Sequence, residues 1–370
     1  MYDFCVVGGG MVGSALTLGL AKKGFKVAMI EPMIPTPYAP EQPPDLRVSA
    51  ISLTSETLLR ELGAWPYIES MRLCAYKRLS VWDNPSCRTD FNCSSIKQHH
   101  LGHIIENRIV QLGIYAALES EKNVMFFKGA KIAKIDNAET SHITLENAET
   151  ISSKLVVGAD GGHSMVREAA NIGTQGWEYS QQALGIQIKT QQAQQDITWQ
   201  QFTPQGPMAF LPLYDGYASL VWYHSAADIK HLKAMSKPKL KQHILQHFPA
   251  DLVDFEVLEL ASFPLTRMHA NHYFKGNTVL VGDAAHTINP LAGQGVNLGF
   301  KDVTAILAII GEELSKNDRT TMLQQPCYEN WLRKYEFSRR KDNLMMMSAM
   351  DLLYSTFSNN HSGLKMLRNL

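Results

Sequence analysis

The sequence of 370 residues is short of the features that mark several large classes of protein. Its five cysteines contain no C-x-x-C pair, which favours free thiols in a reducing compartment over a disulfide framework. Thirty-five basic residues balance 35 acidic ones, so no overall field attracts nucleic acid. No apolar run approaches the roughly 20 residues that a membrane span needs, and the N-terminus lacks a signal-peptide pattern. These absences predict a cytoplasmic protein, or one peripheral to the inner face of the plasma membrane.

The first 31 residues do have a clear pattern, which predicts a strand, a helix and a second strand. Tyr2–Val7 is a short apolar run, typical of a buried parallel strand. A helix then extends to about Lys23, ended by Gly24, and Lys26–Glu31 follows as the next strand. Such a unit is the signature of a doubly wound α/β sheet.

The turn of this unit carries the spacing G-x-G-x-x-G at Gly8, Gly10 and Gly13. The first glycine allows the tight turn, the second lets the backbone approach a pyrophosphate, and the third allows the helix to pack closely on the strand. Glu31 follows Gly13 by 18 residues, where a carboxylate can bind ribose hydroxyls. The pattern predicts a bound dinucleotide without separating NAD from FAD.

Two later segments have a similar strand–turn–helix pattern. Residues 156–167 read VVGADGGHSMVR, and residues 279–299 read VLVGDAAHTINPLAGQGVNLG. With the glycine turn, they resemble the three motifs of the class A flavoprotein monooxygenases, in the same order along the whole chain. The resemblance implies FAD as the cofactor and a p-hydroxybenzoate hydroxylase-like α/β fold, in which a Rossmann-like domain carries an inserted β-sheet substrate domain and a helical C-terminal segment.

This resemblance also implies roles for individual residues. Glu31 would bind the adenosine ribose, Asp160 would lie near the pyrophosphate, and Asp283 would hold the ribityl chain. An alternative for both aspartates is strand-end capping, because aspartate often precedes a helix. The other implied cofactor-binding residues are Gly8, Gly10, Gly13, Arg47, Gln111, Gly161, Gly282, Gly295 and Asn297.

The third motif is expected to form the environment of the flavin ring. The positive end of a helix that starts near Gly293 can face the N1–C2=O edge of the flavin. Pro290 would lie beside the ring and limit water there. His286 is open to a catalytic interpretation, although packing or hydrogen bonding is the commoner role for a histidine in such a loop. No acid or base residue is assigned.

Further segments resemble one family, the FAD-dependent hydroxylases of ubiquinone biosynthesis. They are DLRVSAIS (45–52), residues 198–223, FPLTR (263–267) and MDLLYSTFSNN (350–360). The similarity is greatest to members that add the last ring hydroxyl, to 2-octaprenyl-3-methyl-6-methoxy-1,4-benzoquinol. It implies that NAD(P)H reduces FAD, that O₂ then forms a flavin C4a-hydroperoxide, and that the electron-rich ring attacks its distal oxygen. The alternatives are a sister hydroxylase acting at another ring position and a non-catalytic FAD-binding scaffold subunit.

The substrate is expected between the flavin and a β-rich domain. Residues 177–265 contain short apolar runs separated by Pro/Gly turns, and this pattern predicts that domain. The expected strands are Trp199–Phe202, Ala209–Leu213 and Ala218–Tyr223. Residues that could line the substrate space are Phe210, Leu211, Pro212, Leu213, Trp222 and Tyr223, with sheet core as the alternative. The predicted division is 1–72, 104–176 and 266–321 for FAD, 73–103 and 177–265 for the β-rich domain, and 322–370 for the helical segment.

Other predictions concern helices, metals and docking. Helices are expected at Ser55–Leu62, Asn107–Glu119 and Val296–Ile310, and antiparallel strands within 124–157. No metal site is predicted, because a di-iron hydroxylase needs two Glu-x-x-His pairs and this chain has only Glu139 with His142. Basic residues between Arg333 and Lys341 precede an apolar segment. That pattern fits docking on a membrane or on a ubiquinone-biosynthesis complex, and equally fits a helix closing over the core.

Overall fold

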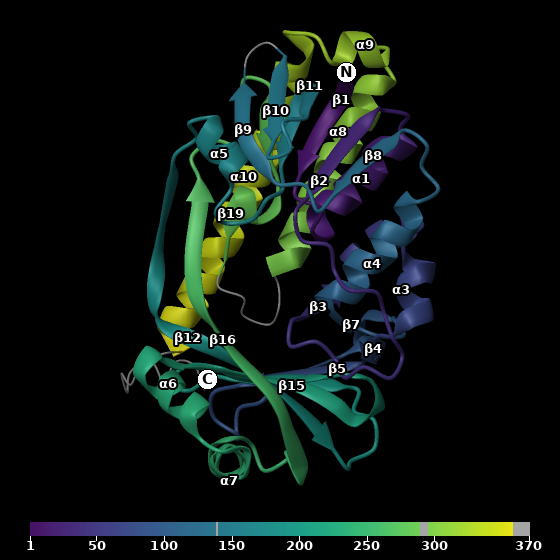
Figure 1. Cartoon of the computed structure of the whole chain (residues 1–370). Helices are drawn as coiled ribbons and strands as arrows, with labels where there is room; N and C mark the ends of the chain where they lie inside the picture. Colours follow the sequence, from purple (N-terminus) through teal and green to yellow (C-terminus); the bar gives the residue numbers. More distant parts are fainter. Residues whose placement is uncertain (138–139, 289–294, 358–370) are drawn as a thin grey trace.

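The computed structural model describes residues 1–137, 140–288 and 295–357. It contains a sheet of eight strands at each end of the molecule, and a smaller three-stranded sheet between them (Figure 1). The helix α10 (Cys327–Phe357) starts beside the first sheet and runs towards the second (Figure 1).

The first sheet is the doubly wound sheet that the N-terminal pattern predicts. Its main strand order is β17-β18-β11-β1-β2-β8, with β10 and β9 attached beside β11. The strands β18, β11, β1, β2 and β8 run parallel to one another, whereas β17 pairs antiparallel with β18. The strands are β1 (Tyr2–Val7), β2 (Val27–Glu31), β8 (Val124–Lys128), β9 (Ile132–Asn137), β10 (Ser141–Leu145), β11 (Thr150–Gly158), β17 (Phe274–Lys275) and β18 (Thr278–Leu280).

Helices cover this sheet and complete the main hydrophobic core. Strand β2 is buried at every residue, as expected of a strand that has helices on one face and further structure on the other. Phe4, Leu16 and Phe300 are examples of the large side chains in this core, each with at most 1% of its surface exposed. The contributing helices include α1 (Met11–Lys22), α4 (Asn107–Leu118), α5 (Met165–Ala169), α8 (Gly295–Leu314), α9 (Arg319–Met322) and the first part of α10.

The second sheet has the order β19-β16-β12-β15-β14-β13-β5-β6. Two short helices, α6 (Ala226–Ala234) and α7 (Lys237–His247), cover one of its faces. Its strands are β5 (Arg78–Trp82), β6 (Thr89–Asn92), β12 (Thr174–Thr190), β13 (Ile197–Gln201), β14 (Met208–Pro212), β15 (Tyr217–Ser225), β16 (Phe255–Ala270) and β19 (His286–Thr287).

The three-stranded sheet joins these two parts. It consists of β3 (Val48–Ser52), β7 (Gly102–Glu106) and β4 (Cys74–Tyr76), with β7 in the middle. The helices α2 (Leu53–Glu61) and α3 (Trp65–Met71) follow β3 in the chain. Short 3-10 turns complete the described elements, namely η1 (Cys93–Ile96), η2 (Tyr214–Gly216) and η3 (Gly282–Ala284).

Most of the predicted elements are confirmed, and two predictions need correction. Residues 124–128 do not join an antiparallel group, because β8 pairs in parallel with β2. The region 177–265 is also less purely β than predicted, since it includes α6 and α7. The division into domains stays a prediction, and the strands β12 and β16 run across its boundaries after residues 176 and 265.

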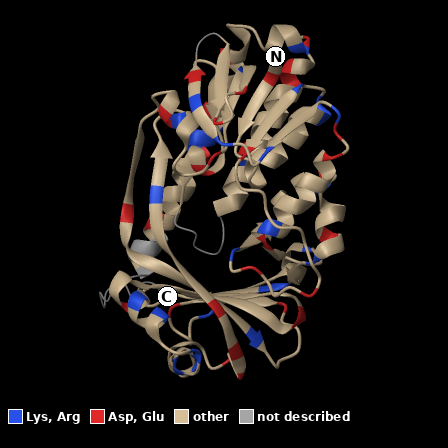
Figure 2. Ribbon diagram, in the orientation of Figure 1, with Lys and Arg blue, Asp and Glu red and all other residues tan. Residues whose placement is uncertain are grey.

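Charge and hydropathy bear on where the molecule could dock. Lys and Arg are interspersed with Asp and Glu over both ends of the molecule (Figure 2). Within the described part of the chain, no helix is both long enough and apolar enough to span a bilayer. Two residues of the predicted basic segment pair within the protein: Arg339 is buried against Asp302, and the half-exposed Lys334 bonds Glu313. The helix therefore closes over the core on this side, while Phe337, Met345 and Leu352 remain exposed.

Candidate active site

The glycine turn lies between β1 and α1, and its three glycines meet different surroundings. Gly8 has a φ of +98°, and a Cβ there would lie 2.3 Å from the Ala159 carbonyl oxygen. A Cβ at Gly13 would lie 1.9 Å from the Gly8 carbonyl oxygen. Gly10 has an ordinary φ of −61°, and a Cβ there would meet nothing within 4 Å. The fold therefore requires Gly8 and Gly13, whereas Gly10 leaves open space at the start of α1.

Glu31 ends β2 directly beside this turn. Its Oε2 accepts a hydrogen bond from the Gly9 N–H at 2.7 Å, and its Oε1 accepts one from the Met33 N–H at 2.8 Å. Because each carboxylate oxygen has a second lone pair, Glu31 can still accept bonds from ribose hydroxyls. The residue thus fixes the glycine turn and keeps acceptor capacity next to it.

Gln111 also acts on the glycine turn. From α4, its Nε2 donates to the Gly9 carbonyl at 2.8 Å, and the Tyr115 hydroxyl donates to the same oxygen at 2.7 Å. Gln111 and Tyr115 also bond each other at 2.9 Å. The described role of Gln111 is therefore to hold the backbone of the turn, and Tyr115 is a partner that the sequence did not indicate.

The second motif places Asp160 just after β11. Its Oδ1 accepts from the Ser164 hydroxyl at 2.5 Å, and its Oδ2 accepts from the Val166 N–H at 3.2 Å. Burial raises the pKa of the Asp160 carboxyl, although these bonds act in the opposite direction. Both oxygens thus serve the start of α5, which is the capping interpretation of this aspartate. Gly161 follows with a φ of +80° and open space around it.

The third motif places Asp283 differently. Its side chain is exposed to solvent, yet desolvation raises the pKa of its carboxyl, while His286 and Arg47 lower it. Arg47, also exposed, acts on Asp283 from the segment before β3. The fold thus brings these two predicted cofactor residues near each other, although they are far apart in the sequence.

A buried network holds the turn that carries Asp283. Asp302 of α8 is fully buried; its Oδ2 accepts from the Gly282 N–H at 3.0 Å and bonds the His286 Nε2 at 2.5 Å. Its Oδ1 accepts from the Arg339 Nε at 2.8 Å. Burial pushes the pKa of Asp302 up, but His286 and Arg339 outweigh it and keep the pKa below its usual value. His286 is therefore a hydrogen-bonding residue of this network.

Sequence reasoning missed Asp302, Arg339 and Arg167. The available signal for Asp302 was an acidic residue within the otherwise apolar segment 296–310. Arg167 joins the second motif to the third, since its guanidinium donates to the carbonyl oxygens of Gly162 at 2.8 Å and Ala284 at 3.0 Å. Nothing in its sequence context indicated that contact.

Asn297 connects the start of α8 to the three-stranded sheet. Its side chain accepts from the Ser52 N–H at 3.0 Å and from the Ser55 hydroxyl at 2.7 Å, and it donates to the Ala50 carbonyl at 2.7 Å. Gly295 begins α8 with open space where a Cβ would lie. Pro290 and Gly293, predicted beside the flavin ring, lie outside the described residues.

The predicted substrate residues divide between two faces of the second sheet, because neighbours on a strand point to opposite sides. Phe210 stacks on Trp199, and Trp222 meets the Phe248 ring edge-on at a centroid distance of 5.1 Å. These rings belong to the core shared with α7, so the sheet-core alternative holds for Phe210 and Trp222. On the other strand face, Leu211 and Leu213 pack in a cluster with Ala50 and Ile104, and Tyr223 packs in another with Ala183 and Leu265. Pro212 ends β14 and is buried.

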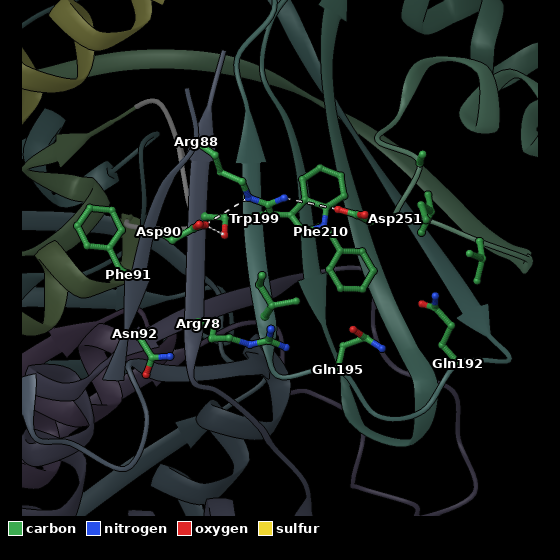
Figure 3. Close-up of a pocket in the computed structure, with 15 residues that line it drawn as sticks. Arg78, Arg88, Asp90, Phe91, Asn92, Gln192, Gln195, Trp199, Phe210 and Asp251 are labelled. Atoms are coloured by element: carbon green, nitrogen blue, oxygen red, sulfur yellow. Dashed lines mark hydrogen bonds and ion pairs between the residues drawn. The ribbon is translucent and has the colours of Figure 1, made fainter. Parts of the chain in front are cut away.

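A hollow of about 760 Å³ lies away from the predicted cofactor residues (Figure 3). It is lined by residues of β5, β6 and β13 and by the segment 250–253, and Phe210 is the predicted substrate residue that borders it. Its cationic side chains are paired: Arg88 with Asp90 and Asp251, and Arg78 with Asp196. None of the predicted cofactor residues lines this hollow.

Comparison with known proteins defines the class. A family model described as an FAD binding domain matches residues 1–328. The fold is similar to that of p-nitrophenol 4-monooxygenase from Pseudomonas putida DLL-E4, with a TM-score of 0.77, 17% identity, and coverage of 100% of this chain and 92% of that one. A probable FAD-dependent monooxygenase from Pseudomonas aeruginosa gives a TM-score of 0.80, 19% identity and 97% coverage of both chains. The fold is that of the class A flavoprotein monooxygenases.

Curated relatives narrow the class to a family. The chain is 43% identical to 3-demethoxyubiquinol 3-hydroxylase of Escherichia coli (strain K12), covering 100% of this chain and 93% of that protein. It is 32% identical to the mitochondrial ubiquinone biosynthesis monooxygenase COQ6 of Rattus norvegicus, covering 100% and 86% respectively. The chain therefore belongs to the FAD-dependent hydroxylases of ubiquinone biosynthesis, with FAD as its cofactor.

Proposed function

We propose that this enzyme carries out the last ring hydroxylation of ubiquinone biosynthesis. The substrate would be 2-octaprenyl-3-methyl-6-methoxy-1,4-benzoquinol, a polyprenylated benzoquinol, with O₂ as the second substrate. The observation that carries the proposal is the 43% identity over the full chain to a relative named for the 3-hydroxylation of demethoxyubiquinol.

The residues of the candidate site fit FAD. Gly10 leaves the backbone at the start of α1 open to a pyrophosphate, and Glu31 keeps free acceptor sites for the adenosine ribose. Asp283, whose side chain is exposed to solvent, would accept bonds from the ribityl hydroxyls. When bound, FAD would take electrons from an external donor, NAD(P)H being typical of the family, and would activate O₂ for transfer to the ring.

We further propose that the substrate ring lies between the first sheet and the inner face of the second sheet. Leu211 and Tyr223 belong to that face and would present apolar surface to the ring or its prenyl tail. This proposal keeps the predicted division of the chain into an FAD-binding part, a β-rich substrate part and a helical C-terminal segment. The chain's own contribution is to orient the ring and exclude water.

Proton transfer needs no strong acid or base from the protein. A quinol hydroxyl already donates electron density to the ring, so the ring carbon is nucleophilic without further activation. Asp160 of the second motif and Asp302 of α8 are both engaged in hydrogen bonds within the fold. The proposal therefore assigns no general base.

The test is a product assay on the purified protein with FAD, a reductant, O₂ and short-tailed quinol analogues that differ in their open ring position. Hydroxylation at the open carbon next to the ring methyl, where the last methoxy group is later built, supports the proposal. Hydroxylation at another carbon would move the enzyme to a sister step, which the 32% identity to COQ6 makes the second candidate. Bound FAD without turnover under every reductant would favour a scaffold role instead.

A further inference from the structure

A group of three potential metal ligands lies on the side of the three-stranded sheet that faces α2 and α3. Among the residues that the structure describes, Glu56, His100 and His103 bring their ligand atoms within 4.8 Å of one another. Glu56 comes from α2, His103 from the central strand β7, and His100 from the segment just before that strand. The Glu56 Oε2 lies 2.7 Å from the His100 Nε2 and 3.1 Å from the His103 Nδ1.

His103 provides an independent sign that something is held there. The residue is 6% exposed, and its Nδ1 makes no hydrogen bond of good geometry, although the Glu56 Oε2 lies 3.1 Å away. Buried polar atoms nearly always have hydrogen-bond partners. An unsatisfied imidazole nitrogen that faces a carboxylate and a second imidazole therefore indicates a site for a ligand. The indole Nε1 of Trp65, whose ring meets the His103 ring at 5.1 Å, is also buried and without a partner.

The surroundings prepare these groups as ligands. The ring centroids of His100 and His103 lie 4.3 Å apart, and a nitrogen of each ring approaches the same oxygen of Glu56. Arg60 bonds the other oxygen of Glu56 at 2.8 Å and so fixes the carboxylate with Oε2 towards the histidines. Such second contacts commonly orient metal ligands.

We infer that Glu56, His100 and His103 bind a divalent transition-metal ion, with Zn²⁺ as the ion that fits this set. Two imidazoles and one carboxylate are ligands that Zn²⁺ accepts at about 2 Å, so a small side-chain movement would bring all three to one ion. Mg²⁺ is disfavoured, because it prefers oxygen ligands. The side chain of His100 is 20% exposed, so the ion can reach the site from solvent.

The position of this site gives the ion a structural role. It would join α2 to β7, and Ser55, next to Glu56, bonds Asn297 at the start of α8. Binding to the folded state alone stabilises that state. The ion would therefore reinforce the contact between α2 and the start of α8, which belongs to the third motif.

The test measures Zn²⁺ binding to the full-length, FAD-loaded protein. Metal content after desalting gives the stoichiometry, and competition with a chromophoric chelator gives the affinity. The expected result is one tightly held Zn²⁺ per chain, a higher melting temperature with Zn²⁺ than with Mg²⁺, and at least about a 100-fold loss of affinity in Glu56→Gln and in His103→Phe. Loss of mere outer contacts costs 10- to 100-fold, so removal of a ligand should cost no less.

His247→Gln is the matched control. His243 and His247 are one turn apart on α7, with ring centroids 4.2 Å apart, and such a pair can itself hold a divalent ion weakly. His247→Gln should therefore leave the tight Zn²⁺ in place. Flavin absorbance shows whether each variant is folded, and His100→Gln replaces His103→Phe if the latter does not fold. Absence of tight Zn²⁺ in the unmodified protein, or the same affinity in folded Glu56→Gln, would overturn the inference.

Discussion

Gly10 differs from the other glycines of its turn in what a side chain would meet. Since a Cβ there has nothing within 4 Å, Gly10→Val should change the free energy of unfolding by no more than about 1 kcal/mol. The same side chain would fill the approach of the pyrophosphate, so FAD affinity should fall at least tenfold, roughly 1.4 kcal/mol. Urea unfolding and fluorimetric FAD titration measure the two effects.

Gly13→Ala is the counterpart, because its Cβ would lie 1.9 Å from the Gly8 carbonyl oxygen. That variant should lose stability even without FAD. If Gly10→Val binds FAD as well as the unmodified protein does, the turn is not where the pyrophosphate lies.

Asp283 and Asp160 should respond differently to the same replacement. Asp283→Ala removes an exposed carboxylate near Arg47 that would hold the ribityl chain, so the purified protein should retain little FAD while keeping its stability. Asp160→Ala removes the acceptor for Ser164 and Val166 at the start of α5, which should cost about 1 kcal/mol of stability. Flavin content after gel filtration compares them. Full FAD occupancy in Asp283→Ala would refute the assignment of that residue.

His269 should make stability depend on pH. It is 4% exposed, and burial, with lesser contributions from His286 and Arg340, lowers its pKa to about 4. An unfolded histidine takes up its proton near pH 6.5, so between these values the unfolded state binds more protons and the folded state loses stability as the pH falls. The loss should reach about 3 kcal/mol by pH 4.

Urea midpoints between pH 4.5 and 7 measure this dependence. His269→Gln should flatten the slope, whereas His163→Gln, at an exposed position, should leave it unchanged. An unaltered slope in His269→Gln would mean that other groups dominate the acid sensitivity.

Among the elements, α10 offers a test of how the C-terminal helix stabilises the fold. Trp331 is fully buried and its indole donates to the Met322 carbonyl at 3.3 Å, whereas Phe337 on the same helix is 78% exposed. Trp331→Ala should cost about 3–5 kcal/mol, because it leaves a large cavity. Phe337→Ala should stay within about 0.5 kcal/mol. Chemical unfolding of both variants measures the difference, and equal effects would show that α10 does not pack as described.

Membrane docking also belongs to this helix. Phe337, Met345 and Leu352 remain exposed beside Lys341, so an interfacial role for this face of α10 stays a prediction.

The elements show where sequence patterns suffice. The strands β1 and β2 and the helix α4 lie within a residue or so of their predicted bounds, because apolar period and capping signals are local. The partner of β8 is not a local property: Val124–Lys128 pairs in parallel with β2, which lies about a hundred residues earlier. The helices α6 and α7 were missed because each is short and only Ile229, Leu232, Leu240 and Ile244 mark their buried sides.

Sequence motifs predicted some residues of the candidate site, but not the contacts between segments that lie far apart in the chain. Glycine spacing and the resemblance to known motifs pointed to Gly8, Glu31 and Asp283. The contacts of Asp302 with Arg339 and of Arg167 with Ala284 join segments that no motif connects. Alternation on β14 and β15 separates Phe210 from Leu211, which a run of apolar letters does not reveal.

At the scale of the whole molecule, the three sheets form one continuous structure. The three-stranded sheet contacts the second sheet through the cluster that includes Ile104 and Leu211, and contacts α8 through Asn297. Over the described residues, Figure 2 shows basic and acidic residues interspersed, which does not favour long-range steering of a charged macromolecule. Recognition of an apolar quinol would thus depend on shape and burial more than on long-range attraction.

The long antiparallel pair of β12 and β16 affects how the two ends of the molecule can move relative to each other. It pairs Thr174 with Ala270 near β19, and Thr190 with Phe255 at the far end of the second sheet, so it extends past both predicted boundaries (Figure 1). Its pairing is interrupted between Glu178 and Gln182, opposite Pro264, which has no N–H to donate. A second register shift lies between Gln187 and Ile188. Because both strands continue past the two boundaries, we expect any widening of the space beside the flavin to bend this strand pair at its irregularities, without rotation of a domain about a linker.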